Sequence, residues 1–331
     1  MKTTFHHFKL FKFTIFMFIF TIAAVLMFIS CSSGGGDGGS ISGGDVVGGG
    51  GTTLPPASVD DTTAAEAASM AFAAAPLMAL DEEFGTLSAS SDTKPSQKIA
   101  DWALRRVKEE IFSAALYQTA GSASESENCT TGNMTMDITW DGPDTVTDCS
   151  QAGNVNATIQ FNQCSESGTY INGTIYLHIS GNLCNPSAMS MDFDNATIQS
   201  GDVNASMNSF SIDFSMSGDT TSATFNGDVS GSAGGVSDAM NFSNFNITDT
   251  EISEGDSATI SGAITGSCFT GWVTFATIEP VFTPYYSDCP TSGQVTVSGD
   301  GVVTVTFNSD YSVTVGDTEY ASCENLPQTC Q

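Results

Sequence analysis

The residues Thr174-Ile-Tyr-Leu-His-Ile179 carry the alternation from which the fold is predicted. Its aliphatic side chains alternate with those of Tyr176 and His178, so a strand over these residues has one apolar and one polar face. A strict period of two with one wetted face is typical of antiparallel sheet, because parallel strands are usually buried on both faces. The same alternation recurs in residues 157–164, 212–216, 303–307 and 311–315.

Composition divides the chain into four segments. Residues 1–30 carry Lys2, Lys9 and Lys12 ahead of an apolar run, which is the layout of an export signal. Residues 31–58 are rich in Gly and Ser and are expected to form a flexible tether. We expect residues 59–120 to be helical and residues 121–331 to form a β-rich domain.

Two stretches within the helical segment carry the helix signals. Residues 61–79 are rich in Ala, and Asp61 or Thr62 is able to cap the start, while Pro76 limits the length. In residues 96–117 apolar residues recur every four positions and make one apolar face, which we expect to cover a sheet. A membrane-surface role is the alternative for that face. The predicted fold is mainly β: an antiparallel curved sheet, half-barrel or sandwich, stapled by disulfides, with one or two N-terminal α-helices packed on it.

The segment Phe28-Ile-Ser-Cys31 ends the apolar run and resembles the lipobox of bacterial lipoproteins. The resemblance implies that Cys31 is lipidated and becomes the first residue of the mature chain. Ser32 in place of Asp then implies delivery to the outer membrane of a Gram-negative cell. An uncleaved anchor helix is the alternative, because about 18 apolar residues also span a bilayer. Both interpretations tether the protein outside the cytoplasm.

The charge is strongly acidic: eight Lys and Arg residues stand against 37 Asp and Glu residues, for a formal net charge of −29. No Lys or Arg follows Lys108. Since the β-rich domain has no basic patch to neutralise phosphates, nucleic-acid binding is excluded. Basic protein partners and cations would be attracted to such a chain.

Cysteine usage agrees with export. The chain has nine cysteines, and apart from Cys31 an even number remains, which in an exported protein indicates disulfides. An antiparallel hairpin would bring the first and third of them to one end, and the next strand would bring the second near the fourth. Sequential pairing of these four is the alternative, and sequence proximity pairs the last four. The predicted bridges are Cys129 with Cys164, Cys149 with Cys184, Cys268 with Cys289, and Cys323 with Cys330.

A weak internal repeat begins at Cys129 and again at Cys289, where each cysteine precedes a glycine and a strand pattern. A second strand then ends in Phe-Asn, and Asp310 stands near the place of Cys164 in the later copy. Together with Asn172-Gly-Thr174, this arrangement resembles a group of uncharacterised, β-rich, cysteine-containing proteobacterial lipoproteins. They share a Cys-Pro-x-x-Gly and Phe-Asn-x-Cys strand pattern. The resemblance implies no activity.

Residues for catalysis or metal binding are few. His178 is the single histidine after the export signal, and no G-x-S-x-G elbow marks a serine for it, so we expect no enzyme. Asp192 and Asp194 lie two apart on a strand and share a face, where Asp213 or Asp228 from neighbouring strands could join them around Ca²⁺. They are weak candidates, and no other cofactor is indicated.

The leading functional hypothesis is a non-enzymatic structural or interaction module of the cell envelope, held to the membrane through its lipid anchor. A carrier or chaperone for lipid or another apolar ligand is the second hypothesis. The third is a Ca²⁺-dependent adhesin or a hydrolase. An apolar cavity would favour the carrier, and its expected lining is Met191, Phe193, Ile212 and Phe214.

Overall fold

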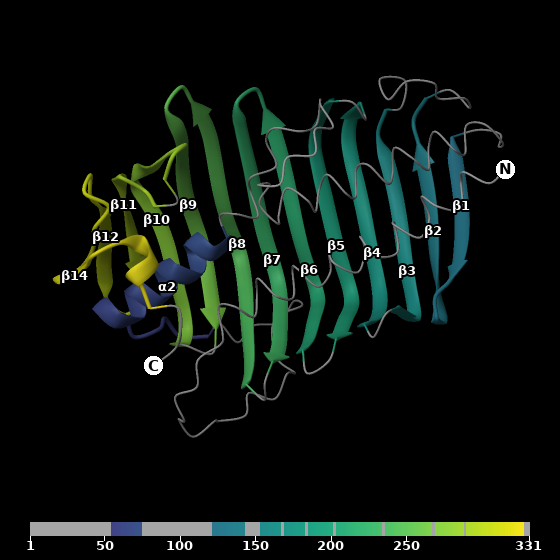
Figure 1. Ribbon diagram of the computed structural model, residues 1–331, viewed down its shortest axis with the longest axis horizontal. Helices are drawn as coiled ribbons and strands as arrows, with labels where there is room; N and C mark the ends of the chain where they lie inside the picture. Colours follow the sequence, from purple (N-terminus) through teal and green to yellow (C-terminus); the bar gives the residue numbers. More distant parts are fainter. Residues whose placement is uncertain are drawn as a thin grey trace.

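The computed structural model describes residues 54–74, 121–142, 153–166, 169–182, 185–200, 203–233, 236–266, 269–287 and 289–327. These residues form one open antiparallel sheet of fourteen strands and a helix at one end of it (Figure 1). The export signal, Cys31 and the helix predicted over residues 96–117 lie outside the described residues.

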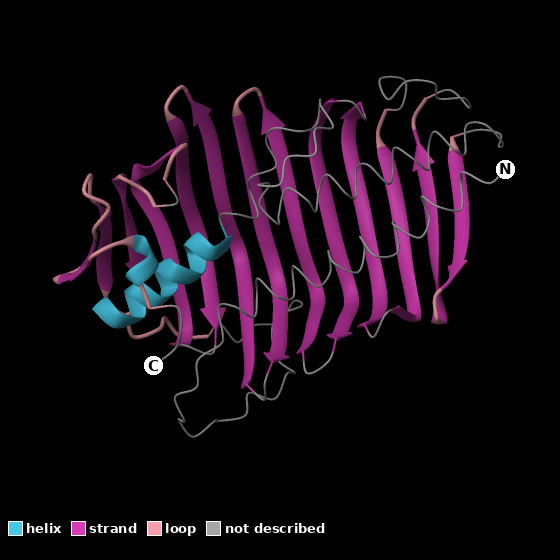
Figure 2. Ribbon diagram, viewed as in Figure 1, coloured by secondary structure: helices cyan, strands magenta, loops and turns pink. Residues whose placement is uncertain are grey.

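The strands follow one another in the sheet in the order of the chain, so every connection joins neighbours. Figure 2 shows the strands side by side, with the helix at the end of the sheet opposite β1. The strands are β1 (Ser122–Asn128), β2 (Thr131–Trp140), β3 (Val155–Glu166), β4 (Thr169–Asn182), β5 (Asn185–Ser200), β6 (Val203–Ser217), β7 (Thr220–Ala233), β8 (Val236–Ile252), β9 (Gly255–Gly266), β10 (Phe269–Pro284), β11 (Ser292–Ser298), β12 (Val302–Phe307), β13 (Val313–Val315) and β14 (Thr318–Tyr320).

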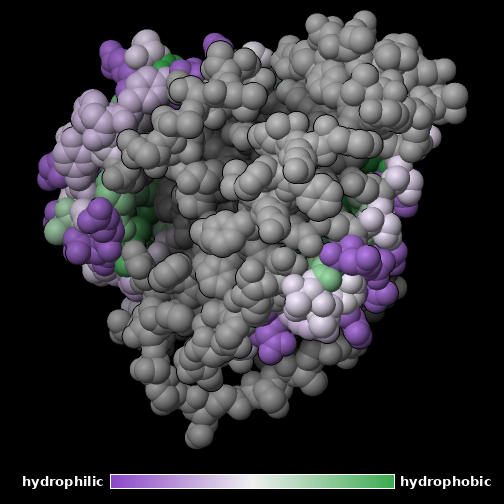
Figure 3. Space-filling model, turned by 45° about the vertical axis from the view of Figure 1, so that its right-hand side comes forward, coloured by the Kyte–Doolittle hydropathy of each residue, from purple (hydrophilic) through white to green (hydrophobic). Residues whose placement is uncertain are grey.

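The sheet has a buried apolar face, here called the inner face, and an exposed polar face, here called the outer face. In β5, Met191 and Phe193 are buried on the inner face, while Asp192 and Asp194 are exposed on the outer face. Figure 3 shows hydrophobic residues set inward from a hydrophilic edge. Phenylalanine rings with centroids 5.6 to 6.2 Å apart cross the inner face in the order Phe193, Phe210, Phe242, Phe225, Phe245 and Phe275.

A row of β-bulges crosses the middle of the sheet. Asn195 in β5 and Asn244 in β8 have φ angles of 49° and 46°, and the ladders beside them shift register. A glycine on a neighbouring strand faces each of these asparagines: Gly173 of β4, with φ +113°, faces Asn195, and Gly262 of β9, with φ +103°, faces Asn244. A Cβ at either glycine would overlap the backbone of the bulge, so only glycine fits. Bulges of this kind bend the strands and increase their twist.

Helix α2 (Asp61–Ala74) packs on the inner face against β11, β12 and β13. The contact surface of the helix consists of small side chains, including the buried Ala64, Ala65 and Ala68, which allow a close approach to the sheet. The prediction of an N-terminal helix packed on the sheet is therefore confirmed over residues 61–74 of the expected 61–79, and residues 75–79 lie outside the described residues.

The N-cap of α2 is Asp60, and the prediction of Asp61 or Thr62 is wrong by one or two residues. The Oδ1 atom of Asp60 accepts the backbone N–H of Thr63 at 2.8 Å, and hydrogen bonds from Thr63 lower the pKa of this carboxyl. Asp61 instead fastens the helix to the sheet. Its Oδ2 atom accepts the N–H of Asp317 at 3.0 Å and the hydroxyl of Thr318 at 3.1 Å.

The segment before α2 is held by the C-terminal strands. The N–H of Ala57 donates to the carbonyl of Trp272 at 2.9 Å, and the N–H of Asp300 donates to the carbonyl of Ala57 at 2.7 Å. The N–H of Val59 then donates to Asp300 Oδ1 at 2.9 Å. The segment of residues 54–60 and the C-terminal strands, which are more than 200 residues apart in the sequence, therefore meet at one end of the sheet.

The mainly β, antiparallel fold is confirmed. Of the three architectures predicted, the structure has an open sheet and not a sandwich, because all strands of the described residues lie in one hydrogen-bonded order. None of the helices in the described part of the chain is long and apolar enough to cross a membrane.

Candidate functional site

Two disulfides lie near opposite ends of the strand order. Cys129, just before β2, is joined to Cys164 in β3 with the Cα atoms 5.4 Å apart, as the hairpin geometry predicts. Cys289, before β11, is joined to Cys323 in the 3₁₀ helix η3 (Cys323–Asn325) with the Cα atoms 5.6 Å apart.

The pairing predicted for the last four cysteines is wrong. Cys289 cannot bond Cys268, nor Cys323 bond Cys330, because Cys289 and Cys323 are bonded to each other. Strands β13 and β14 turn the chain back beside β12 and return it to the loop before β11, which sequence proximity does not capture. Sequential pairing of the first four is wrong as well, because the first is bonded to the third. Cysteines that lie outside the described residues are Cys31, Cys149, Cys184, Cys268 and Cys330, so the predicted bond between Cys149 and Cys184 stays a prediction.

His178 lies on the outer face of β4 between two hydrogen-bonding partners. Its Nδ1 atom is 2.7 Å from Asn156 Oδ1, and its Nε2 atom is 3.0 Å from Ser180 Oγ. With the proton on Nδ1, the ring donates to Asn156 and accepts the hydroxyl proton of Ser180, which is the order of groups around an activated nucleophile. The N–H of Gly181 beside this serine already donates to Asn154 Oδ1 at 3.1 Å, so it is not available to stabilise an oxyanion.

The aspartates predicted to bind Ca²⁺ lie on the outer face, but they do not form a cluster of metal ligands. Asp192 and Asp194 are both exposed on β5, as the alternation predicts. Desolvation, together with the negative charge of Asp192, raises the pKa of Asp213 on β6. Asp228 accepts a hydrogen bond from the amide of Asn241. Within the described residues, no group of three or more His, Cys, Asp or Glu side chains is arranged to hold a metal ion. The calcium site stays a prediction.

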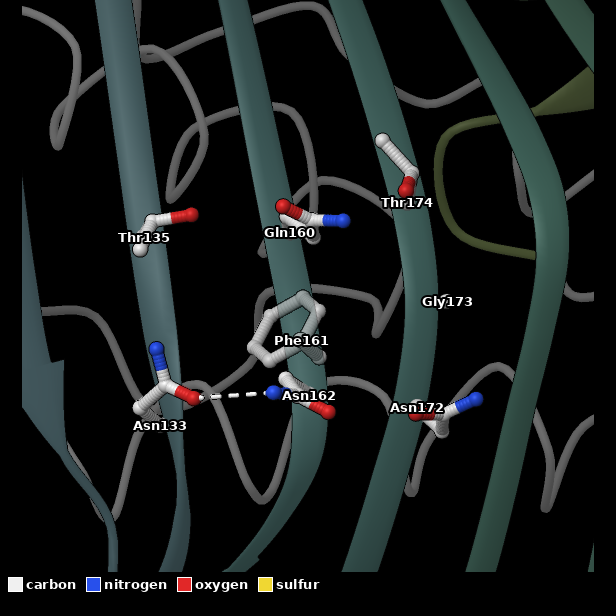
Figure 4. A pocket seen from close by; sticks show the side chains of 8 residues that line it. All are labelled: Asn133, Thr135, Gln160, Phe161, Asn162, Asn172, Gly173 and Thr174. Atoms are coloured by element: carbon white, nitrogen blue, oxygen red, sulfur yellow. Dashed lines mark hydrogen bonds between the residues drawn. The ribbon is translucent and has the colours of Figure 1, made fainter.

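A polar hollow of about 230 Å³ lies on the outer face of β2, β3 and β4, beside the bulge in β3 (Figure 4). The ladder pairs Thr135 with Gln160 and Gln160 with Thr174, so a row of polar side chains crosses three strands. A second row below it consists of amides, and Phe161 and Gly173 complete the wall. The full lining is Asn133, Thr135, Gln160, Phe161, Asn162, Asn172, Gly173 and Thr174.

The amides of the second row are held in place by hydrogen bonds. Asn162 Nδ2 donates to Asn133 Oδ1 at 3.2 Å, and Asn172 Oδ1 accepts the backbone N–H of the bulge residue Gln163 at 3.2 Å. The second polar atom of each of these three side chains has no partner among the described residues. The amide atoms of Gln160 and the hydroxyl of Thr174 have no partner among the described residues, so donors and acceptors remain available around the hollow.

Exposed tyrosines stand beside the hollow on β4. Tyr170 and Tyr176 project from the outer side of the strand, 40% and 45% exposed, with Asn172 and Thr174 between them. No side chain of the lining carries a charge. The nearest acid by register is Asp194, the partner of Thr174 on β5. This arrangement can hold an uncharged ligand that offers hydroxyl groups and a flat apolar face.

The hollow is a site that the sequence patterns do not predict. In the sequence, Asn172-Gly-Thr174 and the Phe-Asn pair stand out only as elements of a repeat. The available signal was an Asn-Gly pair inside a strand pattern, which indicates a bulge and therefore a break in the regular polar surface.

The residues named for an apolar cavity are packed. Met191, Phe193, Ile212 and Phe214 lie on the inner face, each 5% exposed or less. The carrier hypothesis stays a prediction, without an open apolar surface at these positions to support it.

No protein-family model, curated protein or solved structure matches the chain. The resemblance to proteobacterial lipoproteins therefore stays a prediction, and function must be argued from the geometry of the sheet.

Proposed function

We propose that this chain is a non-enzymatic lipoprotein of the bacterial cell envelope, anchored to the outer membrane through Cys31, which uses its sheet as an interaction module. One observation carries the proposal: an exposed polar face crosses the sheet while the opposite face is buried. A single layer of this kind offers partners a wide, rigid surface on one side only.

The two disulfides support a location outside the cytoplasm, because disulfide bonds persist in oxidising compartments. The lipobox-like segment before Cys31 supports the anchor. Residues 54–60 attach at the end of the sheet that carries α2, so a tether preceding them would leave β1–β5 far from the point of attachment. We expect that part of the outer face to be available to partners.

The test is mass spectrometry of the protein from the membrane fraction, without reduction. We expect a diacyl or triacyl mass on an N-terminal Cys31 and peptides that link Cys129 to Cys164 and Cys289 to Cys323. The Cys31→Ser variant should leave the lipid off and retain the export signal. An unmodified Cys31 in the wild-type protein, or reduced cysteines at the four linked positions, would contradict the proposal.

A hydrolase is the second candidate function, favoured by the contacts of His178 with Asn156 and Ser180. As the Ser180 oxygen attacks an acyl carbon, its proton would pass to Nε2 of His178, which returns it to the leaving alcohol or amine when that bond breaks. Water would then release the acyl group from Ser180 as a carboxylic acid. The test is labelling with a fluorophosphonate probe. Label on Ser180 that disappears in His178→Gln would support a hydrolase, and an unlabelled wild-type protein would remove this candidate.

A further inference from the structure

We infer that the hollow on β2, β3 and β4 is a binding site for a neutral oligosaccharide chain. The inference rests on the proposed interaction module and names the chemistry of its partner. The observations that carry it are the size and lining of the hollow, its free hydrogen-bonding groups, the flanking tyrosines and the charge of the surrounding face.

The lining matches the surface of a sugar. A pyranose ring presents neighbouring hydroxyl groups, each of which both donates and accepts. Amide side chains offer both functions in fixed geometry, and threonine hydroxyls rotate to suit either. The amides of Asn133, Asn162 and Asn172 are already oriented by hydrogen bonds, so little side-chain entropy is lost on binding. Gln160 stands between them and Thr174 and would complete the set.

The tyrosines supply flat apolar surfaces for the C–H faces of sugar rings. Tyr170 and Tyr176 point to the same side of β4 as the hollow and leave much of each ring in solvent. Six residues of strand place them about 20 Å apart, which is the length of about four pyranose rings. A chain that stacks on both rings would therefore lie along β4 and pass over Asn172 and Thr174.

The charges in and around the hollow favour a neutral sugar over an acidic one. The lining is neutral, and the β-rich domain has no Lys or Arg to pair with a uronate, sulfate or phosphate group. Asp192 and Asp194 on the adjacent strand would repel such groups at low ionic strength. A neutral hexose or N-acetylhexosamine chain meets no such penalty.

The experiment is isothermal titration calorimetry of the full-length protein in detergent with cellotetraose, maltotetraose, tetra-N-acetylchitotetraose and, as the charged probe, tetragalacturonate. At least one neutral probe should bind, and tetragalacturonate should bind more weakly. Tyr176→Ala and Gln160→Ala should each weaken binding of the neutral probe about tenfold. Both side chains are exposed and make no hydrogen bond in the described residues, so these variants should fold.

Matched controls lie at the other end of the sheet. Tyr286, which is 82% exposed, and Gln294 on β11 should tolerate replacement by Ala with less than about a twofold change in affinity. Absence of binding by all neutral probes at millimolar concentration would overturn the inference, as would equal affinity of Tyr176→Ala, Gln160→Ala and the wild type. Neither result would alter the mass at Cys31, so the anchored module is tested separately.

Discussion

The two cysteine-led hairpins, β2–β3 and β11–β12, share a motif but differ in what their polar side chains do. Their disulfides close stretches of similar length, 35 and 34 residues. In the first hairpin, the side chain of Asn162 donates to Asn133, has no other partner among the described residues and is exposed beside the hollow. In the second, the equivalent Asn308 donates to the hydroxyls of Ser312 and Thr314 and closes its own turn.

The second hairpin also has α2 on its inner face and the segment of residues 54–60 at its edge. Asp310, which stands at the place of Cys164, accepts hydrogen bonds from the N–H and the hydroxyl of Ser312. The shared motif therefore gives both hairpins the same backbone. Whether the surface beside each hairpin is open to ligands depends on the hydrogen-bonding partners of Asn162 and Asn308.

The largest expected effect is loss of a disulfide. Replacing both Cys129 and Cys164 by Ser should lower the free energy of unfolding by about 3 to 4 kcal/mol, because the unfolded chain loses a cross-link. The pair Cys289 and Cys323 should show a loss of the same size, since the closed lengths match. Urea unfolding followed by circular dichroism measures both, and unequal losses would show that the two ends are not equivalent in stability.

Replacing a glycine by Ala should destabilise the protein more in β4, near the first hairpin, than after β13, near the second. Gly173→Ala should cost about 3 kcal/mol, because its φ of +113° is strained for Ala and the new Cβ meets the backbone of Asn195 and Ala196. Gly316→Ala, with φ +56°, should cost about 1 to 2 kcal/mol, since its Cβ meets only the side chain of Asp61, whose displacement loses hydrogen bonds to Asp317 and Thr318 but shifts no backbone. Thermal unfolding of both variants measures the order, and a larger loss at Gly316 would contradict the rigid bulge.

Removal of the α2 cap should affect the second hairpin alone. Asp60→Ala should cost about 1 kcal/mol at neutral pH. Because the folded-state pKa of Asp60 is lowered, its contribution is present above the unfolded value of 3.8 and is lost as the pH falls through the folded value. Thermal unfolding at neutral pH and well below that value tests this, and a cost that is independent of pH would contradict the charged cap.

The smallest expected effect lies between the hairpins, at Asp213. Its raised pKa means that its ionisation opposes folding as the pH rises through the folded-state value. Because solvent screens an exposed carboxyl, Asp213→Asn should raise stability at neutral pH by only about a few tenths of a kcal/mol. The gain should vanish below the unfolded value of 3.8, where both forms are neutral. Chemical unfolding across this pH range measures the change, and a loss of stability at neutral pH would contradict the cost of desolvation and the repulsion by Asp192.

Local pattern predicted the strands and the two faces of the sheet, because alternation depends only on the backbone period. The cross-link between Cys129 and Cys164 followed from the hairpin geometry. Alternation could not distinguish an open sheet from a sandwich, since both bury one face of each strand. The bond between Cys289 and Cys323 depends on the short return through β13 and β14, which carries little periodic signal. The hollow was missed because it arises where alternation breaks, at residues such as Gln163 with φ 49°.

The most direct test of the difference between the hairpins is hydrogen–deuterium exchange with and without the neutral tetrasaccharide that binds best. Bound sugar should slow exchange of peptides from β2, β3 and β4 around the bulge and leave those from β11, β12 and β13 unchanged. Slowed exchange confined to β11–β13, or spread equally over both hairpins, would contradict the account of an open ligand surface at one end and a closed one at the other.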